Sequence, residues 1–106
     1  MEKDKSFITH KSNGFCLNFP NGNWLSTVWG VGTYSENYDC EGGYGEWEKL
    51  YNSKMGSNTC EVMPKCSELV KKLLDATFPE ETNGGVFGHM TFEKWLKMVN
   101  ILNENV

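Results

Sequence analysis

The side chains that could make or break bonds are few and are scattered along this chain. His10 and His89 are its two histidines, and neither stands in a motif with a serine or cysteine nucleophile. Glu46 and Glu48 lie two residues apart, which puts two carboxylates on one face of a strand, where paired acids can do acid–base work. Lys49 beside them fits an ordinary solvated face equally well. The residues predict no catalytic set, and we expect a protein that is not an enzyme.

Ring-bearing side chains are the clearest sign of a function. The chain holds 6 Phe, 4 Trp and 4 Tyr among 106 residues, more than two small helices and one sheet need. Several lie in or beside the glycine-rich residues 30–45, where backbone can approach a ligand closely and tyrosine offers a flat apolar face with a polar tip. A segment of this length is typical of a functional loop, although a loop whose tyrosines pack on the sheet fits the pattern too. The candidate ligand- or partner-binding residues are Trp24, Trp29, Tyr34, Tyr38, Tyr44 and Trp47.

The cysteines offer a second kind of chemistry. There are four, none in a Cys-x-x-Cys pair: Cys16, Cys40, Cys60 and Cys66. An even number permits two disulfides, whereas the spacings to the histidines match no zinc pattern. We expect reduced thiols, with Cys16 and Cys60 as small buried apolar residues in strands. A catalytic pairing of Cys40 with His89 remains an alternative that depends on the fold. We predict no metal and no cofactor.

The elements that position these residues are organised around one hairpin. Two apolar runs, Phe15–Phe19 and Trp24–Trp29, flank Asn21-Gly22, a strong signal for a two-residue type I′ turn. Both central positions of that turn need φ > 0, which glycine takes freely and asparagine tolerates. Pro20 lacks an N–H and should lie outside the ladder. Neither face of the second run is polar, which favours a central strand covered on both sides.

Three further segments carry strand-forming residues between turn signals: Ser6–His10, Glu46–Asn52 and Thr59–Met63. Residues 11–14 predict a turn that makes the first strand part of a hairpin, and Pro64 predicts the end of the last strand. With the central hairpin, these segments predict a meander of four to five antiparallel strands. Val86–Met90 is expected to be a short extended link.

After Ser67 the apolar period changes to that of a helix. Ser67 and Thr91 are the expected N-caps, Pro79 is expected to stop the first helix, and the second should run from Phe92 to about Asn103. The predicted apolar stripes are Leu69, Val70, Leu73, Leu74 and Phe78, then Phe92, Trp95, Leu96, Val99 and Leu102. We predict a single α+β domain over residues 1–106, with both helices on one face of the sheet, a flexible N-terminus at residues 1–5 and a long Gly/Tyr loop at residues 30–45.

Charge and hydropathy exclude several classes of function. The net charge is −4, which argues against general nucleic-acid binding. The chain has no arginine, so it cannot form the bidentate grip by which arginine holds carboxylates and phosphates. No apolar run approaches the roughly 20 residues of a membrane helix. The charged start, Met-Glu-Lys-Asp-Lys, lacks the apolar core of a signal peptide. We expect a cytoplasmic protein with no membrane contact.

The order of these features resembles a group of small phage-encoded accessory proteins with an F-x-N-G hairpin motif. The matching positions, over roughly residues 15–102, are Phe19-Pro20-Asn21-Gly22, Ser26 in the next strand, Gly32-Thr33-Tyr34 in a loop, Trp47-Glu48 and the capping Thr91. An extra helix at Lys65–Phe78 departs from the pattern. Some small phage proteins sequester a nucleotide signal, as the Thoeris anti-defence sponges do, and others plug a defence enzyme.

The resemblance implies action by binding, in the cytoplasm of the host cell. We expect a non-catalytic accessory protein, working as a homo-oligomer, that binds and neutralises a host defence protein or a nucleotide-type signal. The missing arginine argues against a strong grip on a pyrophosphate. The alternative is a small self-associating structural or interaction module without a ligand.

Overall fold

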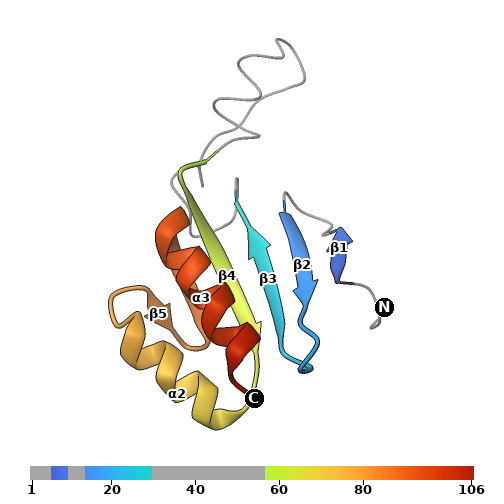
Figure 1. The fold of residues 1–106 in the computed structure, drawn as a ribbon. Coiled ribbons are helices and arrows are strands. Elements are labelled where there is room, and N and C mark those ends of the chain that lie inside the picture. Colours follow the sequence, from blue (N-terminus) through green and yellow to red (C-terminus); the bar gives the residue numbers. More distant parts are fainter. Residues whose placement is uncertain (1–5, 10–13, 30–56) are drawn as a thin grey trace.

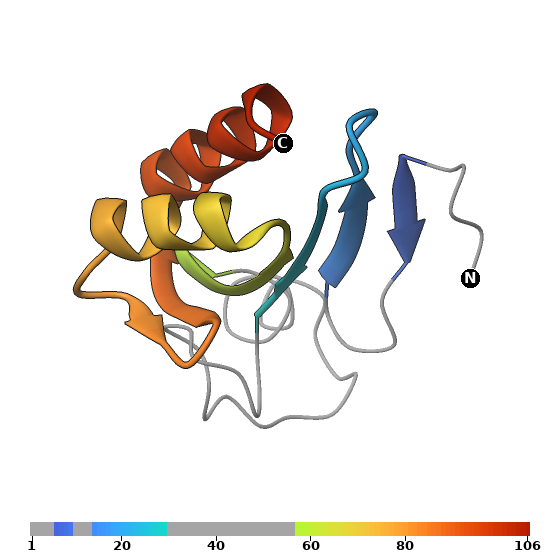
Figure 2. The ribbon, with the colours of Figure 1, turned by 90° about the horizontal axis from the view of Figure 1, so that it is seen from below.

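A computed structural model describes residues 6–9, 14–29 and 57–106 of the chain. The strands are β1 (Phe7–Thr9), β2 (Gly14–Asn18), β3 (Trp24–Val28), β4 (Thr59–Lys65), β5 (Thr82–Asn83) and β6 (Val86–Thr91), and the helices are α2 (Glu68–Thr77) and α3 (Phe92–Glu104). Within these residues the strands form one antiparallel sheet in the order β1-β2-β3-β4-β6-β5. Both helices lie on one face of it, so the predicted α+β class is confirmed (Figures 1 and 2).

The central hairpin is confirmed, but its predicted turn type is wrong. β2 and β3 pair in register, with Cys16 opposite Ser26. The Gly22 N–H donates to the Phe19 carbonyl oxygen at 3.0 Å, and the Phe19 N–H donates to the Asn23 carbonyl oxygen at 2.9 Å. Gly22 has φ 94°, whereas Asn21 has no positive φ. The connection is therefore a three-residue loop closed by a left-handed glycine, in which Pro20 takes a favoured turn position.

The C-terminal half contributes two strands that the sequence analysis did not predict. Val86–Met90 is more than an extended link, because β6 lies between β4 and β5 inside the sheet. Asn83 pairs with Val86 across Gly84 and Gly85, whose φ values are 61° and 92°. Positive φ at both residues of a two-residue loop is the geometry of a type I′ turn. Counted over the described residues, the sheet has six strands, against the four to five expected.

Pro64 lies inside β4 and does not end it. It pairs with Leu25 of β3, and the pairing of β4 with β6 reaches only to Val62. Pro64 is therefore in a part of β4 with one paired neighbour, where a missing N–H is tolerated because it can point away from that neighbour.

Both helices begin at the predicted caps. The Ser67 hydroxyl oxygen accepts a hydrogen bond from the Val70 N–H, and the Thr91 hydroxyl oxygen accepts one from the Lys94 N–H, each at 3.3 Å. The buried side of each helix is rotated from the predicted stripe. Leu69 and Leu73 of α2, and Phe92 and Leu96 of α3, are exposed, whereas Met98 is fully buried. Each helix therefore leaves two residues of its predicted stripe exposed.

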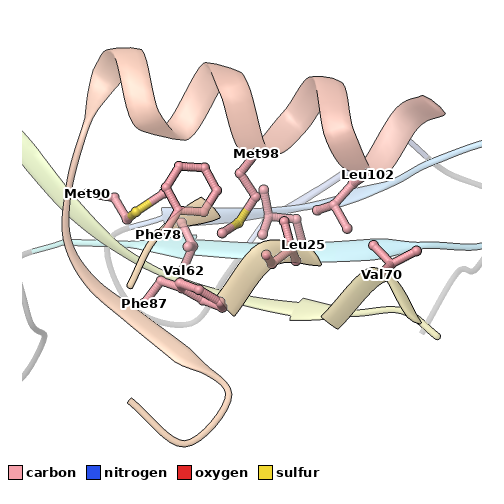
Figure 3. Packing of buried hydrophobic residues seen from close by; sticks show 9 residues of the cluster. Leu25, Val62, Val70, Phe78, Phe87, Met90, Met98 and Leu102 are labelled. Atoms are coloured by element: carbon pink, nitrogen blue, oxygen red, sulfur yellow. The ribbon is translucent and has the colours of Figure 1, made fainter. Parts of the chain in front are cut away.

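The core lies between the helices and the sheet. Its buried residues are Leu25, Val62, Val70, Leu74, Phe78, Phe87, Met90, Met98 and Leu102. Figure 3 shows Met98 and Leu102 projecting from α3 toward Leu25 and Val62 on the sheet. Because side chains alternate along a strand, Leu25 and Thr27 face the helices while Ser26 and Val28 face the other side. All four are buried, as predicted for a central strand.

The tip of the β2–β3 hairpin is bonded to the C-terminal end of α3. The Asn23 amide nitrogen donates to the carbonyl oxygens of Leu102 at 2.8 Å and Asn105 at 2.6 Å. The Asn21 amide nitrogen donates to the Leu102 carbonyl oxygen at 2.7 Å. The last carbonyls of a helix have no partner within the helix, so these amides act as its C-terminal cap. They fix α3 across the end of the sheet.

Several predictions concern residues outside the described ranges. They are the flexible residues 1–5, the turn at residues 11–13, the Gly/Tyr loop at residues 30–45 and the strand at residues 46–52. Cys16, Cys60 and Cys66 are free thiols, and Cys40 also lies outside those ranges. In the portions of the chain that are described, neither helix has the length and apolar character needed to cross a membrane.

Candidate functional site

An open cavity of about 280 Å³ lies where the sheet meets the first turn of α3. Its described lining includes four aromatic residues: Phe15, Trp29, Phe92 and Trp95. Thr27, Cys60 and Met90 also line it, and residues 57–59 stand at its side. The cavity is close to the lower end of the range for ligand pockets, which runs from about 300 to 1,000 Å³. We call it the aromatic pocket.

The β2–β3 register brings the pocket residues of the sheet together. Phe15 pairs with Thr27, so both side chains point to the helix-covered face, and Trp29 follows two residues later on that face. Gly14 opens β2 beside this pair. A Cβ atom at position 14 would collide with the Thr27 carbonyl oxygen, so glycine is required by the close approach of the two strands.

The four rings form a connected wall. The Phe15 ring centroid lies 6.4 Å from that of Trp29 and 6.2 Å from that of Trp95, with both contacts edge-to-face. Phe92 stacks on Trp95 with 5.9 Å between centroids and 24° between planes. Both geometries are favourable for aromatic pairs. The rings hold one another in place. A flat apolar group that enters the pocket therefore contacts ring faces and ring edges in fixed positions.

One hydrogen bond fixes the orientation of Trp95. Its indole N–H donates to the Thr27 hydroxyl oxygen at 2.9 Å, which links α3 to the middle of β3. The indole therefore presents carbon atoms to the cavity while its polar atom is satisfied within the fold. Thr27 is buried and shapes the pocket through Trp95.

We expect Thr27→Val to lower the free energy of unfolding by about 1–2 kcal/mol, because it keeps the shape of the side chain and leaves the Trp95 N–H without its acceptor. Urea unfolding measures the loss, and the NMR signal of the Trp95 indole N–H should move. Thr27→Ser keeps the hydroxyl and serves as the control. A valine variant as stable as the wild type would show that this hydrogen bond contributes nothing.

Cys60 adds apolar surface to the pocket. Burial, reinforced by the nearby Glu61 carboxylate, raises the pKa of the Cys60 thiol to about 12. The group stays protonated at neutral pH, and a protonated thiol is a poor nucleophile and metal ligand. Among the described residues, no group of three His, Cys, Asp or Glu side chains is placed to hold a metal ion.

The structure separates the two predicted binding residues that it describes. Trp29 lines the aromatic pocket. Trp24 lies at the other end of β3, on the opposite face from Leu25 and Thr27, and Lys65 Nζ lies 5.4 Å from the centroid of its ring. Within the described residues, the buried Trp24 indole N–H has no hydrogen-bond partner. The remaining candidates, Tyr34, Tyr38, Tyr44 and Trp47, fall outside the described ranges.

Sequence reasoning missed most of the pocket. The sequence predicts Phe92 and Trp95 in a core stripe on the last helix, and Phe15 in the first strand of the central hairpin. Five apolar residues are no more than a helix of 13 residues normally buries, so the stripe alone carries no sign of a pocket.

Fold and site together define a small α+β protein with an open, ring-lined pocket at one end of its sheet. Comparisons with protein families, with curated proteins and with solved structures find no match to this chain.

Proposed function

We propose that this protein is a non-catalytic binding protein whose aromatic pocket takes up an uncharged, apolar group of its partner. The observation that carries the proposal is a chain of four rings, each in contact with the next, beside an open cavity of about 280 Å³. Clustered aromatic residues beside a pocket are typical of the centres of protein interfaces, where a few side chains supply most of the binding energy.

The chemistry of the pocket favours a protein partner over a nucleotide. No lysine or histidine is among its described lining residues, and the chain has no arginine. A nucleotide could stack its base on the rings, but its phosphates would find no cation in that lining. A leucine or aromatic side chain of a partner protein carries no charge and needs no cation in the pocket. We therefore place a host defence protein ahead of a nucleotide-type signal as the partner.

The biological setting of the proposal follows from the resemblance to small phage accessory proteins. On this proposal the protein acts in the cytoplasm of the bacterial host and blocks a defence protein by occupying one of its surfaces. The missing match to a known family leaves the choice of defence protein to experiment.

The test is a binding screen of the full chain against purified bacterial defence proteins and a panel of cyclic nucleotides, by biolayer interferometry or calorimetry. We expect a defence protein to bind. Trp29→Ala should weaken that binding about 30-fold, the effect of losing an interface residue worth roughly 2 kcal/mol.

Trp24→Ala is the matched control for this screen, because it removes the same ring from the other face of the same strand. It should leave the affinity within about twofold. Two outcomes contradict the proposal: no protein binds, or both alanine variants lose the same affinity. If only a cyclic nucleotide bound tightly, the pocket would still be a binding site, but the partner would be a nucleotide and not a defence protein.

A further inference from the structure

A second feature of α3 is its exposed flank, which begins at the aromatic pocket. Phe92 is 69% exposed and Leu96 is 43% exposed, and they lie four residues apart, one above the other on the helix. Figure 2 shows α3 at the outside of the molecule with the sheet on one side of it. Two large apolar side chains thus project from the same strip of surface.

Two charged residues follow this apolar pair with the same spacing. Glu93 comes directly after Phe92, and Lys97 comes directly after Leu96, so they form a parallel strip of one negative and one positive charge. Both are exposed, and the described part of the chain shows no ion pair for either. Lys94, by contrast, is held 2.6 Å from the Glu81 carboxylate.

The surface formed by these two strips can pack against the same surface of a second copy of the chain. When two copies of a helix pack antiparallel about a two-fold axis, each position meets its counterpart on the other side of the centre. A two-fold axis midway between Phe92 and Lys97 places Phe92 within one residue of the partner's Leu96 and Glu93 within one residue of the partner's Lys97. The two-fold symmetry repeats each contact, so the dimer has two Phe92–Leu96 contacts and two Glu93–Lys97 charge pairs.

We propose that two copies of this chain associate through the Phe92–Lys97 flank of α3, packed antiparallel. The charge complementarity between the two strips selects a second copy over other occupants of this apolar surface. A single helix pair buries less than the roughly 800 Å² per partner of a standard interface, so the dimer dissociates on dilution. Because Phe92 also lines the aromatic pocket, the second copy borders the mouth of that pocket.

The test uses sedimentation equilibrium of the full chain and a pair of charge reversals. The wild type should show a concentration-dependent dimer. Glu93→Lys and Lys97→Glu each place like charges opposite each other twice, so each variant alone should associate about tenfold more weakly. Circular dichroism verifies that both variants are folded, because Glu93→Lys also removes a favourable charge from the helix N-terminus.

Mixing the two variants is the decisive step. In a mixed dimer the introduced lysine faces the introduced glutamate, and the native lysine faces the native glutamate, so association should return to near the wild-type level. Leu96→Ser should weaken the wild-type dimer, whereas Leu69→Ser, on an exposed site of α2, should not. A wild type that stays monomeric, or reversals that leave association unchanged singly and mixed, would overturn the inference. Neither result bears on whether the pocket binds a host protein.

Discussion

Replacing Phe87 with alanine is expected to lower the free energy of unfolding by about 4 kcal/mol, the typical cost of removing a buried phenyl ring. Phe87 is 2% exposed and lies in β6, between the sheet and the helix layer (Figure 3). Its ring meets that of Phe78 edge-to-face, with 6.1 Å between centroids. The substitution removes this contact and leaves a cavity in the hydrophobic core. Urea unfolding followed by circular dichroism measures the effect.

Phe92→Ala is the matched control for that measurement, because it removes the same ring from an exposed site. We expect it to change the free energy of unfolding by less than about 1 kcal/mol. A domain of this size has a total stability on the order of 5–15 kcal/mol, so the Phe87 variant should unfold at distinctly lower urea. Equal losses for the two variants would mean that β6 is not part of the core.

The second large effect is expected at the tip of the central hairpin. Asn23→Ala should cost about 2 kcal/mol, because it removes two hydrogen bonds at a buried position and leaves Asn21 as the one side-chain amide, among the described residues, that still donates to the carbonyl oxygens of Leu102 and Asn105. Asn23 is 5% exposed, and its amide bonds to Leu102 and Asn105 are 2.8 and 2.6 Å long. Thermal and urea unfolding both report the loss, and hydrogen exchange should accelerate in the last turn of α3.

Asn100→Ala provides the comparison, since Asn100 is exposed in the middle of the same helix. Alanine has the higher helix propensity, so this variant should be unchanged or slightly more stable. If Asn23→Ala proves as harmless as Asn100→Ala, the hairpin tip does not cap α3. The cap also gives the F-x-N-G motif a structural role, in which Asn21 binds the helix end and Gly22 closes the turn.

The parts of the fold that local chemistry decides could be predicted from the sequence. Ser67 and Thr91 start their helices as caps, and the two apolar runs from Phe15 to Trp29 form the central hairpin. The turn inside that hairpin could not be predicted. In this turn the Asn21 side chain donates a hydrogen bond to Leu102, a residue 81 positions away. A local sequence pattern cannot indicate such a distant partner.

The C-terminal strands were missed for a related reason. Val86–Met90 is short and follows two glycines, so its sequence alone indicates a link. It is a strand because it pairs with β4. Pro64 was expected to end β4, because a sequence does not show that β6 stops short of it. Pairing between distant segments decided both cases.

The candidate site was predictable only in part. Trp29 stood out by residue type, and the structure places it in the pocket. Trp24 stood out equally, yet the two residues are five positions apart, and an odd offset along a strand directs their side chains to opposite faces of the sheet. Trp95 belongs to the pocket because of its bond to Thr27 and its contacts with Phe15 and Phe92, none of which a helical pattern reveals.

The most direct test of the account is an NMR titration of the ¹⁵N-labelled protein with toluene, a ring that carries no charge and no hydrogen-bonding group. The tryptophan indole N–H signals report on each face of β3 separately. If the aromatic pocket takes up apolar groups, the signals of Trp29 and Trp95 shift and saturate, and the signal of Trp24 stays in place. Unmoved Trp29 and Trp95 signals at the solubility limit of toluene, or an equal shift at Trp24, would contradict the account.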